Sequence, residues 1–361
     1  MAKTQLRLAQ KQDQRLALFG RMRMAEWIEM PERDFAREIE RLEKDALFKK
    51  LYFGGSGVPG ALRRQPWPRA SFAGMAEIDE RVMGGGGQRV KVEEGLQEKA
   101  EIMEKIKALG SEAFERYFLY AQEAVPLPEI SRRTGLPESD VLAINDFLVE
   151  LGAQAEFSTL PRAPGGRGSY CVARLRLEGD EPSFEFFSPH WARGLYRIRY
   201  DLIERMKDSD TLSGSELKKL PGLLKRLETI NLRQSTMFRI LETLTKLQQP
   251  FLKGRRDELK KPVSLRMLAR RLDLAPSTVS RALSDRSVRL PWDKELPLIQ
   301  LLPGRRRQLR LILARWLKED AASTDAALAE RLRHEHGIAV SRRTVNAVRH
   351  EVGPGQKPRR K

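Results

Sequence analysis

The sequence of 361 residues has few of the side chains that build disulfide frameworks and metal sites. Cys171 is the only cysteine, which excludes a disulfide framework and a zinc site made of several thiolates. The four histidines have no cysteine or acidic partners at ligand spacing, and we expect His334 and His336 to lie on the surface. The sequence therefore predicts no metal site and no bound cofactor.

Long hydrophobic runs are also missing. No apolar stretch approaches the length that crosses a membrane, and the N-terminus lacks the hydrophobic region of a signal peptide. We expect a cytoplasmic protein with no membrane partner.

Patterns of catalytic residues are absent as well. The glycine run at 84–87 is not followed by the Gly-Lys-Ser/Thr of a phosphate loop, and the carboxylates are spread over helix faces beside Lys and Arg. Tyr117 and Tyr120 could serve as nucleophiles by residue type, but their helical spacing beside two phenylalanines predicts a place in a core. A nuclease or recombinase is thus a weaker alternative, and we predict no catalytic residue and no small-molecule substrate.

Positive charge is abundant and unevenly placed. The chain carries 67 Lys and Arg against 49 Asp and Glu, a net charge of +18. Residues 304–361 hold 15 of the basic residues and 6 of the acidic ones, so half of the net charge lies in this last part. A concentrated basic region is typical of a surface that contacts phosphates, and nucleic acid is the expected partner.

The helical patterns indicate an all-α, multi-domain fold of extended architecture. In the N-terminal part, a stripe of Phe35, Ile39, Leu42 and Ala46 predicts an amphipathic helix that must dock on another part of the chain. The glycine- and proline-rich stretch at 54–95 is typical of a flexible linker. The alternation in 157–190 allows a small β insert within the otherwise helical region.

One pattern recurs at 126–148, 262–283 and 323–348: a short helix, a turn and a second helix. Each copy fits a helix-turn-helix, whose second helix can enter the major groove of DNA. The first copy carries acidic residues on its second helix, which repel phosphate and favour packing or protein binding.

The second copy is the clearest. Leu265, Leu268, Ala269 and Leu272 are expected to point inward, the turn is expected at 273–276, and Ser277 is expected to cap the second helix. The side chains near the start of that helix are candidates for DNA contacts: Ser277, Thr278, Ser280 and Arg281.

The third copy ends in the decapeptide SRRTVNAVRH, residues 341–350. Spacings of four and three place Arg342, Asn346 and Arg349 on one helix face, with Arg343 at its border. Arg can bind guanine, and Asn can bind adenine, through two hydrogen bonds each. The candidate DNA-binding residues here are Ser341, Arg342, Arg343, Thr344, Asn346 and Arg349. Candidate phosphate contacts are Arg305, Arg306, Arg307, Lys357, Arg359 and Arg360.

This decapeptide resembles the RpoN box, the signature of sigma-54 transcription factors, which usually reads ARRTVAKYRE. Two further segments resemble the same family in the same order. Residues 233–254 are similar to its Arg-x-x-Thr…Gln-Gln…Phe-Phe…Gly stretch, and 261–283 are similar to its KP…HESTVSR helix-turn-helix. Residues 5–48 resemble its first region. Three ordered motifs are more specific than any one of them.

The resemblance implies a transcription initiation factor with five parts. Residues 1–53 would be a regulatory region remodelled by an AAA+ activator ATPase, followed by the linker at 54–95. Residues 96–215 would bind core RNA polymerase. Residues 216–303 would hold a long helix and a helix-turn-helix at the −12 promoter element, and 304–361 would form the RpoN domain at the −24 element. Such a protein would be associated with the nucleoid.

Several features depart from the family pattern. The acidic spacer of the family is replaced by the glycine-rich stretch, and Ala347 and Val348 replace the usual Lys and Tyr of the box. Pro221 and Pro250 are expected to kink or cap the long helix. The main alternative is a helix-turn-helix repressor, or a plasmid or phage DNA-binding protein, that acts without polymerase.

Overall fold

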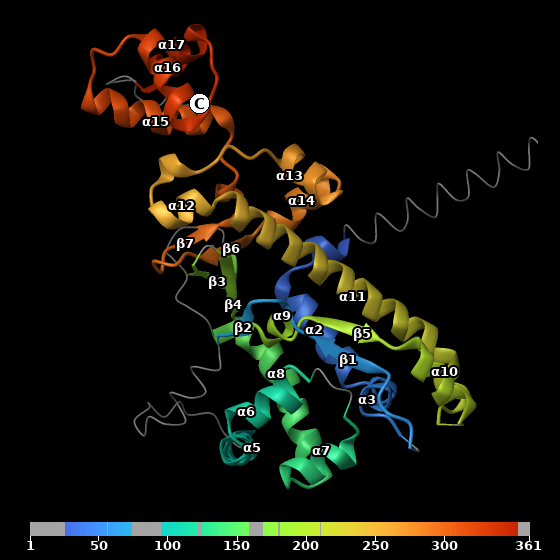
Figure 1. Ribbon diagram of the computed structural model, residues 1–361. Coiled ribbons are helices and arrows are strands. Elements are labelled where there is room, and N and C mark those ends of the chain that lie inside the picture. The colour runs from blue at the N-terminus through green and yellow to red at the C-terminus, as the bar shows by residue number, and fades with distance from the viewer. Residues whose placement is uncertain are drawn as a thin grey trace, which may run out of the picture. The chain divides into compact units, whose positions relative to one another are not determined.

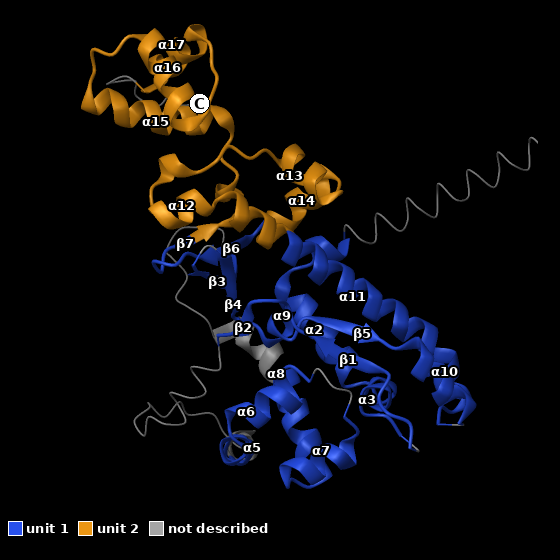
Figure 2. Cartoon of the chain, viewed as in Figure 1, with its two compact units in different colours: residues 1–239, 284–295 blue, residues 240–283, 296–361 orange. Residues whose placement is uncertain are grey.

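The structure is a computed structural model that describes residues 26–55, 57–73, 95–121, 125–158, 169–179, 181–209 and 211–352. The chain forms two compact units (Figure 2): residues 1–239 with 284–295, and residues 240–283 with 296–361. The predicted mostly helical, multi-domain fold is confirmed, but "all-α" was too narrow because two sheets are present.

In unit 1, the expected amphipathic helix is α2 (Glu32–Glu43), and it packs on α8 (Glu138–Ser158). Phe35, Ile39 and Leu42 are buried as predicted. The helix ends earlier than the stripe indicated, because the Asp45 side chain accepts a hydrogen bond from the Leu47 amide and caps a new helix, α3 (Ala46–Phe53). Ala46 is therefore exposed rather than part of the stripe.

The sheets are larger than the expected β insert. The insert forms the hairpin of β3 (Tyr170–Glu178) and β4 (Glu181–Phe186), as predicted. Three other strands extend it in the order β2-β4-β3-β6-β7, where β2 is Ala70–Phe72, β6 is Arg286–Arg289 and β7 is Glu295–Pro297. A second sheet pairs β1 (Leu62–Gln65) antiparallel with β5 (Leu195–Ile198).

Strands β1 and β2 lie in the stretch that composition indicated as a flexible linker. Their side chains explain the difference, since Leu62 is fully buried and Phe72 is 5% exposed. Within 54–95, only residues 54, 55, 57–73 and 95 are described, so the glycine run at 84–87 lies outside the described residues.

The other helices of unit 1 are α5 (Gly95–Leu109), α6 (Ser111–Phe114), the π-helix η1 (Glu115–Leu119), α7 (Leu127–Thr134), α9 (Pro189–Ala192) and α10 (Tyr200–Asp208) (Figure 1). Phe114 and Phe118 are buried and stack at 6.0 Å between ring centroids. Tyr117 and Tyr120 are half-buried beside them, so they lie at the edge of this core and not inside it as predicted.

The long helix α11 (Gly214–Leu247) contributes residues to both units. Pro221 lies inside it, and the helix continues on both sides of this residue. Pro250 stands instead in the first turn of the next helix, α12 (Gln249–Gly254), where a missing amide hydrogen is tolerated. Pro250 therefore belongs to the start of the following helix and does not cap the long helix as expected.

Unit 2 contains α12, a 3-10 helix η2 (Asp257–Leu259), α13 (Leu265–Leu272), α14 (Pro276–Leu283), a 3-10 helix η3 (Leu298–Leu301), α15 (Arg305–Glu319), α16 (Asp325–His336) and α17 (Arg342–Val352). Helices α15, α16 and α17 share a small core built of Leu309, Ile312, Leu313, Trp316, Leu328, Leu332, Ile338, Val345 and Val348.

A buried amide organises the end of α11. The Gln248 side chain donates to the carbonyl oxygens of Lys261 and Leu301, both at 2.8 Å, and accepts from the Lys261 amide at 2.8 Å. Gln248 is fully buried, so leaving these bonds unmade would carry a desolvation cost. This glutamine, which belongs to a motif in the sequence, holds the segment before α13 in place.

Candidate nucleic-acid interface

Helices α13 and α14 form a pair that is joined by a tight turn. The Ser264 hydroxyl caps α13 by accepting from the Met267 amide at 3.1 Å, and Asp273 ends it in the left-handed conformation with φ 56°. Leu268, Ala269 and Leu272 are buried as predicted. Leu265 is only half-buried.

The candidate DNA contacts of the α13–α14 pair lie in the first turns of α14. The helix begins at Pro276, so Ser277 lies inside the first turn instead of capping it as expected. Pro at the first helical position explains the shift, because its fixed φ is already helical. Ser277 is exposed, and Thr278, Ser280 and Arg281 are half-buried. The turn and three of the four inward positions were thus predicted correctly, but the inward place of Leu265 and the capping role of Ser277 were not.

The third pair is formed by α16 and α17. Gly337 ends α16 in the left-handed conformation, and the Ser341 hydroxyl caps α17 by accepting from the Thr344 amide at 3.2 Å. Val345 and Val348 anchor α17 in the core of the domain. Arg342 and Arg343 are exposed in the first turn of the helix. Ser341 therefore has a structural role that its candidacy for DNA binding did not anticipate.

Two further candidate residues on α17, Asn346 and Arg349, form hydrogen bonds within the domain. Arg349 donates from Nη1 to the carbonyl of Ser323 at 2.8 Å and to Asp325 Oδ1 at 3.1 Å, and from Nη2 to the carbonyl of Ala321 at 2.9 Å. Asn346 donates to Asp325 Oδ2 at 2.7 Å. The hydrogen bond from Asn346, followed by that from Arg349, lowers the pKa of Asp325.

The helical spacing therefore placed Asn346 and Arg349 together, but in this structure they face the start of α16. Three of the five donors of Arg349 are used there. Arg342 and Arg343 remain the exposed arginines of the decapeptide. Asp325 lies 24 residues from Arg349 in the sequence and on another helix. A comparison of the decapeptide with a motif therefore does not detect it.

Helix α15 starts with three successive arginines and has no acidic residue in its first turn. Positive charge at a helix N-terminus opposes the helix dipole, so this arrangement favours binding of an anion over helix stability. Arg305 donates to the carbonyl of Ala339, and Arg306 pairs with Glu351. Arg307 is exposed, and within the described part of the chain no carboxylate pairs with it. The remaining phosphate candidates, Lys357, Arg359 and Arg360, lie outside the described residues.

The first helical pair, α7 and α8, differs from the other two. Asp140 and Asp146 of α8 pair with Lys105 and Lys49, each at 2.9 Å. These acidic side chains thus connect α8 to other parts of unit 1. Their contacts fit the expectation of a packing unit better than a DNA-reading one.

Sequence reasoning did not identify the buried ion pairs of unit 1. Glu32, at the start of α2, accepts from Arg233 of α11 and from Arg286 of β6, both at 2.7 Å, and from the Trp191 indole at 3.2 Å. Burial alone would raise the pKa of Glu32, but the two guanidinium groups lower it. Both arginines adjoin the segment 240–283 in the sequence, one before it and one after it. A single carboxylate of α2 therefore connects this helix with α11 and with β6.

A second buried carboxylate, Glu43, accepts from Arg193 at 2.9 Å and from the Tyr196 hydroxyl at 2.5 Å, and it also pairs with Arg64. Burial raises the pKa of Glu43, but Arg193 and Arg64 outweigh it and lower the pKa to about 2. No local sequence pattern signals this network, because its members come from α2, β1, β5 and the end of α9.

Metal and membrane features are few in the part of the chain that the structure describes. There, no group of three or more His, Cys, Asp or Glu side chains could hold a metal ion. No helix among the described residues is long and apolar enough to cross a membrane.

Comparison with known proteins agrees with this geometry. Residues 215–298, which span most of α11 and the α13–α14 pair, match the sigma-54 DNA-binding domain. A Clostridium kluyveri protein named as an RNA polymerase sigma-54 factor is 29% identical over 168 residues, 43% of this chain. The chain spans about a third of that relative's length, 37%.

A crystal structure of Aquifex aeolicus sigmaN bound to promoter DNA is 18% identical, covering 72% of this chain and 81% of that one, with a TM-score of 0.35. A score at this level does not establish a common overall arrangement. The helical pairs and the domain match define a DNA-binding protein of mostly helical, multi-domain construction. Residues 215–298 are thus similar to the DNA-binding domain of the sigma-54 family.

Proposed function

We propose that this protein is a sigma-54-type initiation factor that binds core RNA polymerase and recruits it to promoters with −12 and −24 elements. Promoter opening would be driven by an AAA+ activator ATPase, since no phosphate loop occurs in the sequence. The observation that carries the proposal is the sigma-54 DNA-binding domain at 215–298, followed along the chain by a second helical pair that exposes Arg342 and Arg343.

The proposed division of labour follows the exposure of the side chains. Arg342 and Arg343 are exposed in the first turn of α17, where an arginine fork can reach guanine O6 and N7 in the major groove. Ser277 and Thr278 of α14 would contact bases or phosphates of the −12 element through single hydrogen bonds of their hydroxyl groups. Arg307 would bind phosphate, which supplies affinity and register but no sequence information. Asn346 and Arg349 would hold α17 at the correct angle.

The N-terminal and central parts would take the other roles that the family resemblance implies. We assign the polymerase-binding role to residues 96–215 and the regulatory role to 1–53. Helices α2 and α3 of this region are buried in unit 1, so an activator that displaced them would disrupt a core.

The test is a gel-shift titration at fixed salt with duplex DNA that carries GG and GC elements at sigma-54 spacing, with and without core RNA polymerase. We expect polymerase to supershift the complex, and the double variant Arg342→Ala/Arg343→Ala to lose its preference for the GG element. A scrambled duplex reports the salt-dependent binding that any basic surface gives. Equal binding to both duplexes without a supershift would refute the proposal.

A helix-turn-helix repressor that acts without polymerase is the second candidate. The compact α16–α17 pair with exposed arginines supports it equally well, because that geometry requires only DNA. It predicts sequence-specific binding that polymerase does not change. The polymerase arm of the titration therefore separates the two functions.

A further inference from the structure

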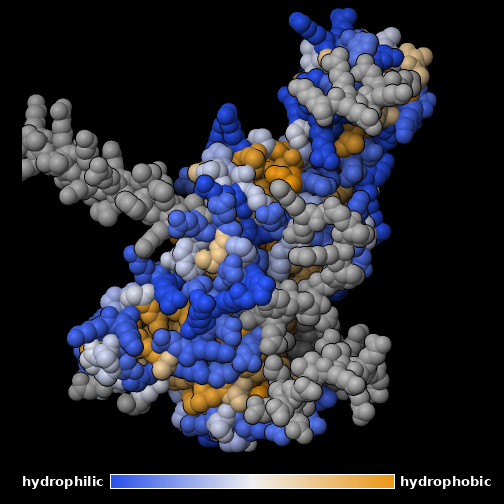
Figure 3. All heavy atoms as spheres, turned by 180° about the vertical axis from the view of Figure 1, so that it is seen from behind, coloured by the Kyte–Doolittle hydropathy of each residue, from blue (hydrophilic) through white to orange (hydrophobic). Residues whose placement is uncertain are grey.

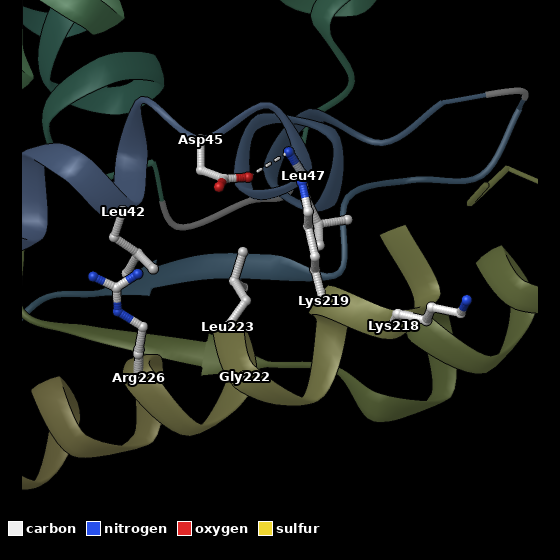
Figure 4. Close-up of a pocket in the computed structure, with 8 residues that line it drawn as sticks. All are labelled: Leu42, Asp45, Leu47, Lys218, Lys219, Gly222, Leu223 and Arg226. Atoms are coloured by element: carbon white, nitrogen blue, oxygen red, sulfur yellow. Dashed lines mark hydrogen bonds between the residues drawn. The ribbon is translucent and has the colours of Figure 1, made fainter. Parts of the chain in front are cut away.

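The groove between α2, α3 and the first turns of α11 in unit 1 has little apolar surface left to cover. It encloses about 350 Å³, and Figure 4 shows Leu223 between Lys219 and Arg226 along it. Its three leucines, Leu42, Leu47 and Leu223, are only 2%, 3% and 7% exposed. On the face of the molecule in Figure 3, hydrophobic residues appear in separate areas of a mostly hydrophilic surface. An apolar ligand would therefore gain little free energy in this groove.

Unit 2 has a different feature: two buried glutamines hold the short segment that precedes the α13–α14 pair. Gln248, between α11 and α12, binds both the amide and the carbonyl of Lys261. Gln308, near the start of α15, donates from its Nε2 atom to the carbonyl oxygen of Lys260. Two consecutive residues are thus bound from two sides. One side is the helix that leads to the α13–α14 pair, and the other is the first helix of the C-terminal domain, α15–α17.

The glutamines and the segment that they hold are buried. Gln248, Gln308 and Lys260 are 0%, 3% and 5% exposed. The Lys260 side chain is held as well, because its Nζ atom lies 4.4 Å from the ring centroid of Phe251 and 2.8 Å from Asp257 Oδ1. A buried carbonyl that loses its donor carries a desolvation cost. Movements that break these hydrogen bonds are therefore opposed.

The same hydrogen bonds reach the segments that enter α13 and α15. Gln248 also donates to the carbonyl of Leu301, which lies three residues before Gly304, the N-cap of α15. Val263, directly before the Ser264 cap of α13, is 2% exposed. Helix α15 itself contacts η2, just before the bound segment. The connection between the two candidate DNA-binding parts therefore consists of buried hydrogen bonds and packing, and not of a free linker.

We propose that Gln308 and Gln248 are positioning residues that fix the C-terminal domain relative to the α13–α14 pair and so determine which spacing of the two promoter elements is accepted. The role assigned to them rests on the proposed function, because it requires that each part binds one element. One added base pair turns the second element by about 35° and moves it by about 3.4 Å along the DNA. A rigid connection cannot follow this displacement, whereas a loosened one can, with a loss of preorganisation.

The test is a series of competition gel shifts with the full-length protein at fixed salt. The duplexes carry the GG and GC elements at the sigma-54 spacing, or with one or two base pairs inserted between them. We expect one inserted base pair to weaken binding by the wild type at least about tenfold. Gln308→Met keeps the length and volume of the side chain but cannot donate, so the same insertion should weaken its binding only about threefold or less. Its affinity for the duplex without insertion should fall about threefold.

Two further variants separate positioning from a loss of stability. Gln248→Met removes three hydrogen bonds, so it should flatten the dependence on spacing at least as much. The matched control is Gln234→Met, since Gln234 is a fully buried glutamine of unit 1 whose Nε2 atom donates to the carbonyl of His190 at 3.0 Å. This control should lower the melting temperature about as much as Gln308→Met does and keep the spacing dependence of the wild type.

Thermal unfolding of each variant checks that it folds, and Gln308→Asn, which is one methylene too short to reach Lys260, replaces Gln308→Met if that variant does not. A wild type that tolerates the inserted base pairs would overturn the positioning role, as would an unchanged spacing dependence in the Gln308 variant. Equal flattening in Gln234→Met would overturn it too, since stability would then explain the effect. Equal binding of the wild type to scrambled duplex is a distinct result, because it would overturn the proposed function and the positioning role together.

Discussion

Arg233 and Arg286 of unit 1 are 0% and 4% exposed, whereas Arg342 and Arg343 of unit 2 lie open on α17. The first pair shares the buried carboxylate of Glu32. The second pair has no ion-pair partner among the described residues. The same side chain thus serves as an internal connector in one unit and as a candidate contact to DNA in the other. Net charge alone cannot distinguish these roles, since every arginine counts equally in a total of +18.

Burial decides which of these arginines matters for stability. An exposed ion pair contributes little, because water already solvates both charges and mobile ions screen them. A buried pair that loses one partner leaves an uncompensated charge in a medium of low dielectric constant. We therefore expect carboxylate substitutions in unit 1 to affect folding, and arginine substitutions on α17 to affect recognition.

The largest effect is expected for Glu32→Ala. It removes the buried carboxylate that Arg233 and Arg286 share, which should lower the free energy of unfolding by about 3–5 kcal/mol. Urea denaturation followed by tryptophan fluorescence measures the change, since Trp191 contacts Glu32. The matched control is Glu335→Ala, which removes an exposed pair with Arg331 and should cost less than about 1 kcal/mol. Equal losses for the two variants would show that the buried pair is not special.

The buried networks should also make folding sensitive to acid. His190 is buried beside Glu43, Arg64 and Arg193, and burial first, then the two arginines, lower its pKa to about 3. In the unfolded chain, histidine takes up a proton below its usual pKa of about 6.5, so the stability of the native state decreases as the pH falls below that value. The expected slope is about 1.4 kcal/mol per pH unit, or roughly 2 kcal/mol between pH 6.5 and 5.

Glu43 acts in the same direction at lower pH. Its lowered pKa stabilises the fold above the usual value of 4.5, and this contribution is lost as the pH falls from 4.5 toward about 2. Urea titrations at pH 6.5, 5.75 and 5 test the histidine separately, because roughly this range lies above the titration of Glu43. The variant His190→Gln should have a much shallower profile there, with the remaining slope coming from groups such as His336, whose pKa burial also lowers. A slope equal to that of the wild type in this variant would assign the acid sensitivity to other groups.

Local patterns predicted much of the helical structure. The stripe of Phe35, Ile39 and Leu42 gave α2 its buried face, and the turn signals around Asp273 and Gly337 located the two C-terminal helical pairs. These signals are short-range: caps, breakers and a period of 3.6 residues act within one or two turns. That is why they hold without knowledge of the rest of the chain.

The sheet and the ion pairs depend on residues far apart in sequence. Strand β6 pairs with β3, which lies more than a hundred residues earlier in the sequence. The four residues of β6 have no alternating pattern of polar and apolar side chains that would predict a strand. Strands β1 and β2 lie in a stretch rich in proline and arginine, whose composition predicted a linker and not strands. Arg64 of β1 illustrates the reason: it is 1% exposed and paired with Glu43, which lies 21 residues earlier in the sequence. Single-sequence reasoning cannot find such a partner.

The exposed arginines of α17 should affect DNA recognition and not stability. Arg342→Ala and Arg343→Ala should each lower the preference for the GG element by about 1–3 kcal/mol and leave the free energy of unfolding unchanged. Competition gel shifts against a scrambled duplex measure the preference. Arg333→Ala is the matched control, since Arg333 is an exposed arginine on α16 of the same domain. If Arg333→Ala has the same effect, the arginines contribute charge but do not read bases.

The smallest loss of stability is expected for a substitution of Arg349. This residue also separates two hypotheses: the motif predicts that it contacts a base, whereas its hydrogen bonds indicate a tether, that is, a side chain that connects α17 to the start of α16. Its guanidinium group donates to two backbone carbonyls and to Asp325 while about a third of the side chain stays exposed. Arg349→Lys keeps the charge but loses the fork, so the C-terminal domain should lose about 1–2 kcal/mol of stability.

Thermal unfolding and competition gel shifts, run on the same preparation of Arg349→Lys, separate the two roles. A tether predicts a lower melting temperature and an unchanged ratio of affinities for the GG and scrambled duplexes, because Arg342 and Arg343 still read the bases in the folded fraction. A base contact predicts the reverse: an unchanged melting temperature and a reduced ratio. The second result would move Arg349 from the connecting arginines, to which its three hydrogen bonds assign it, to the exposed ones.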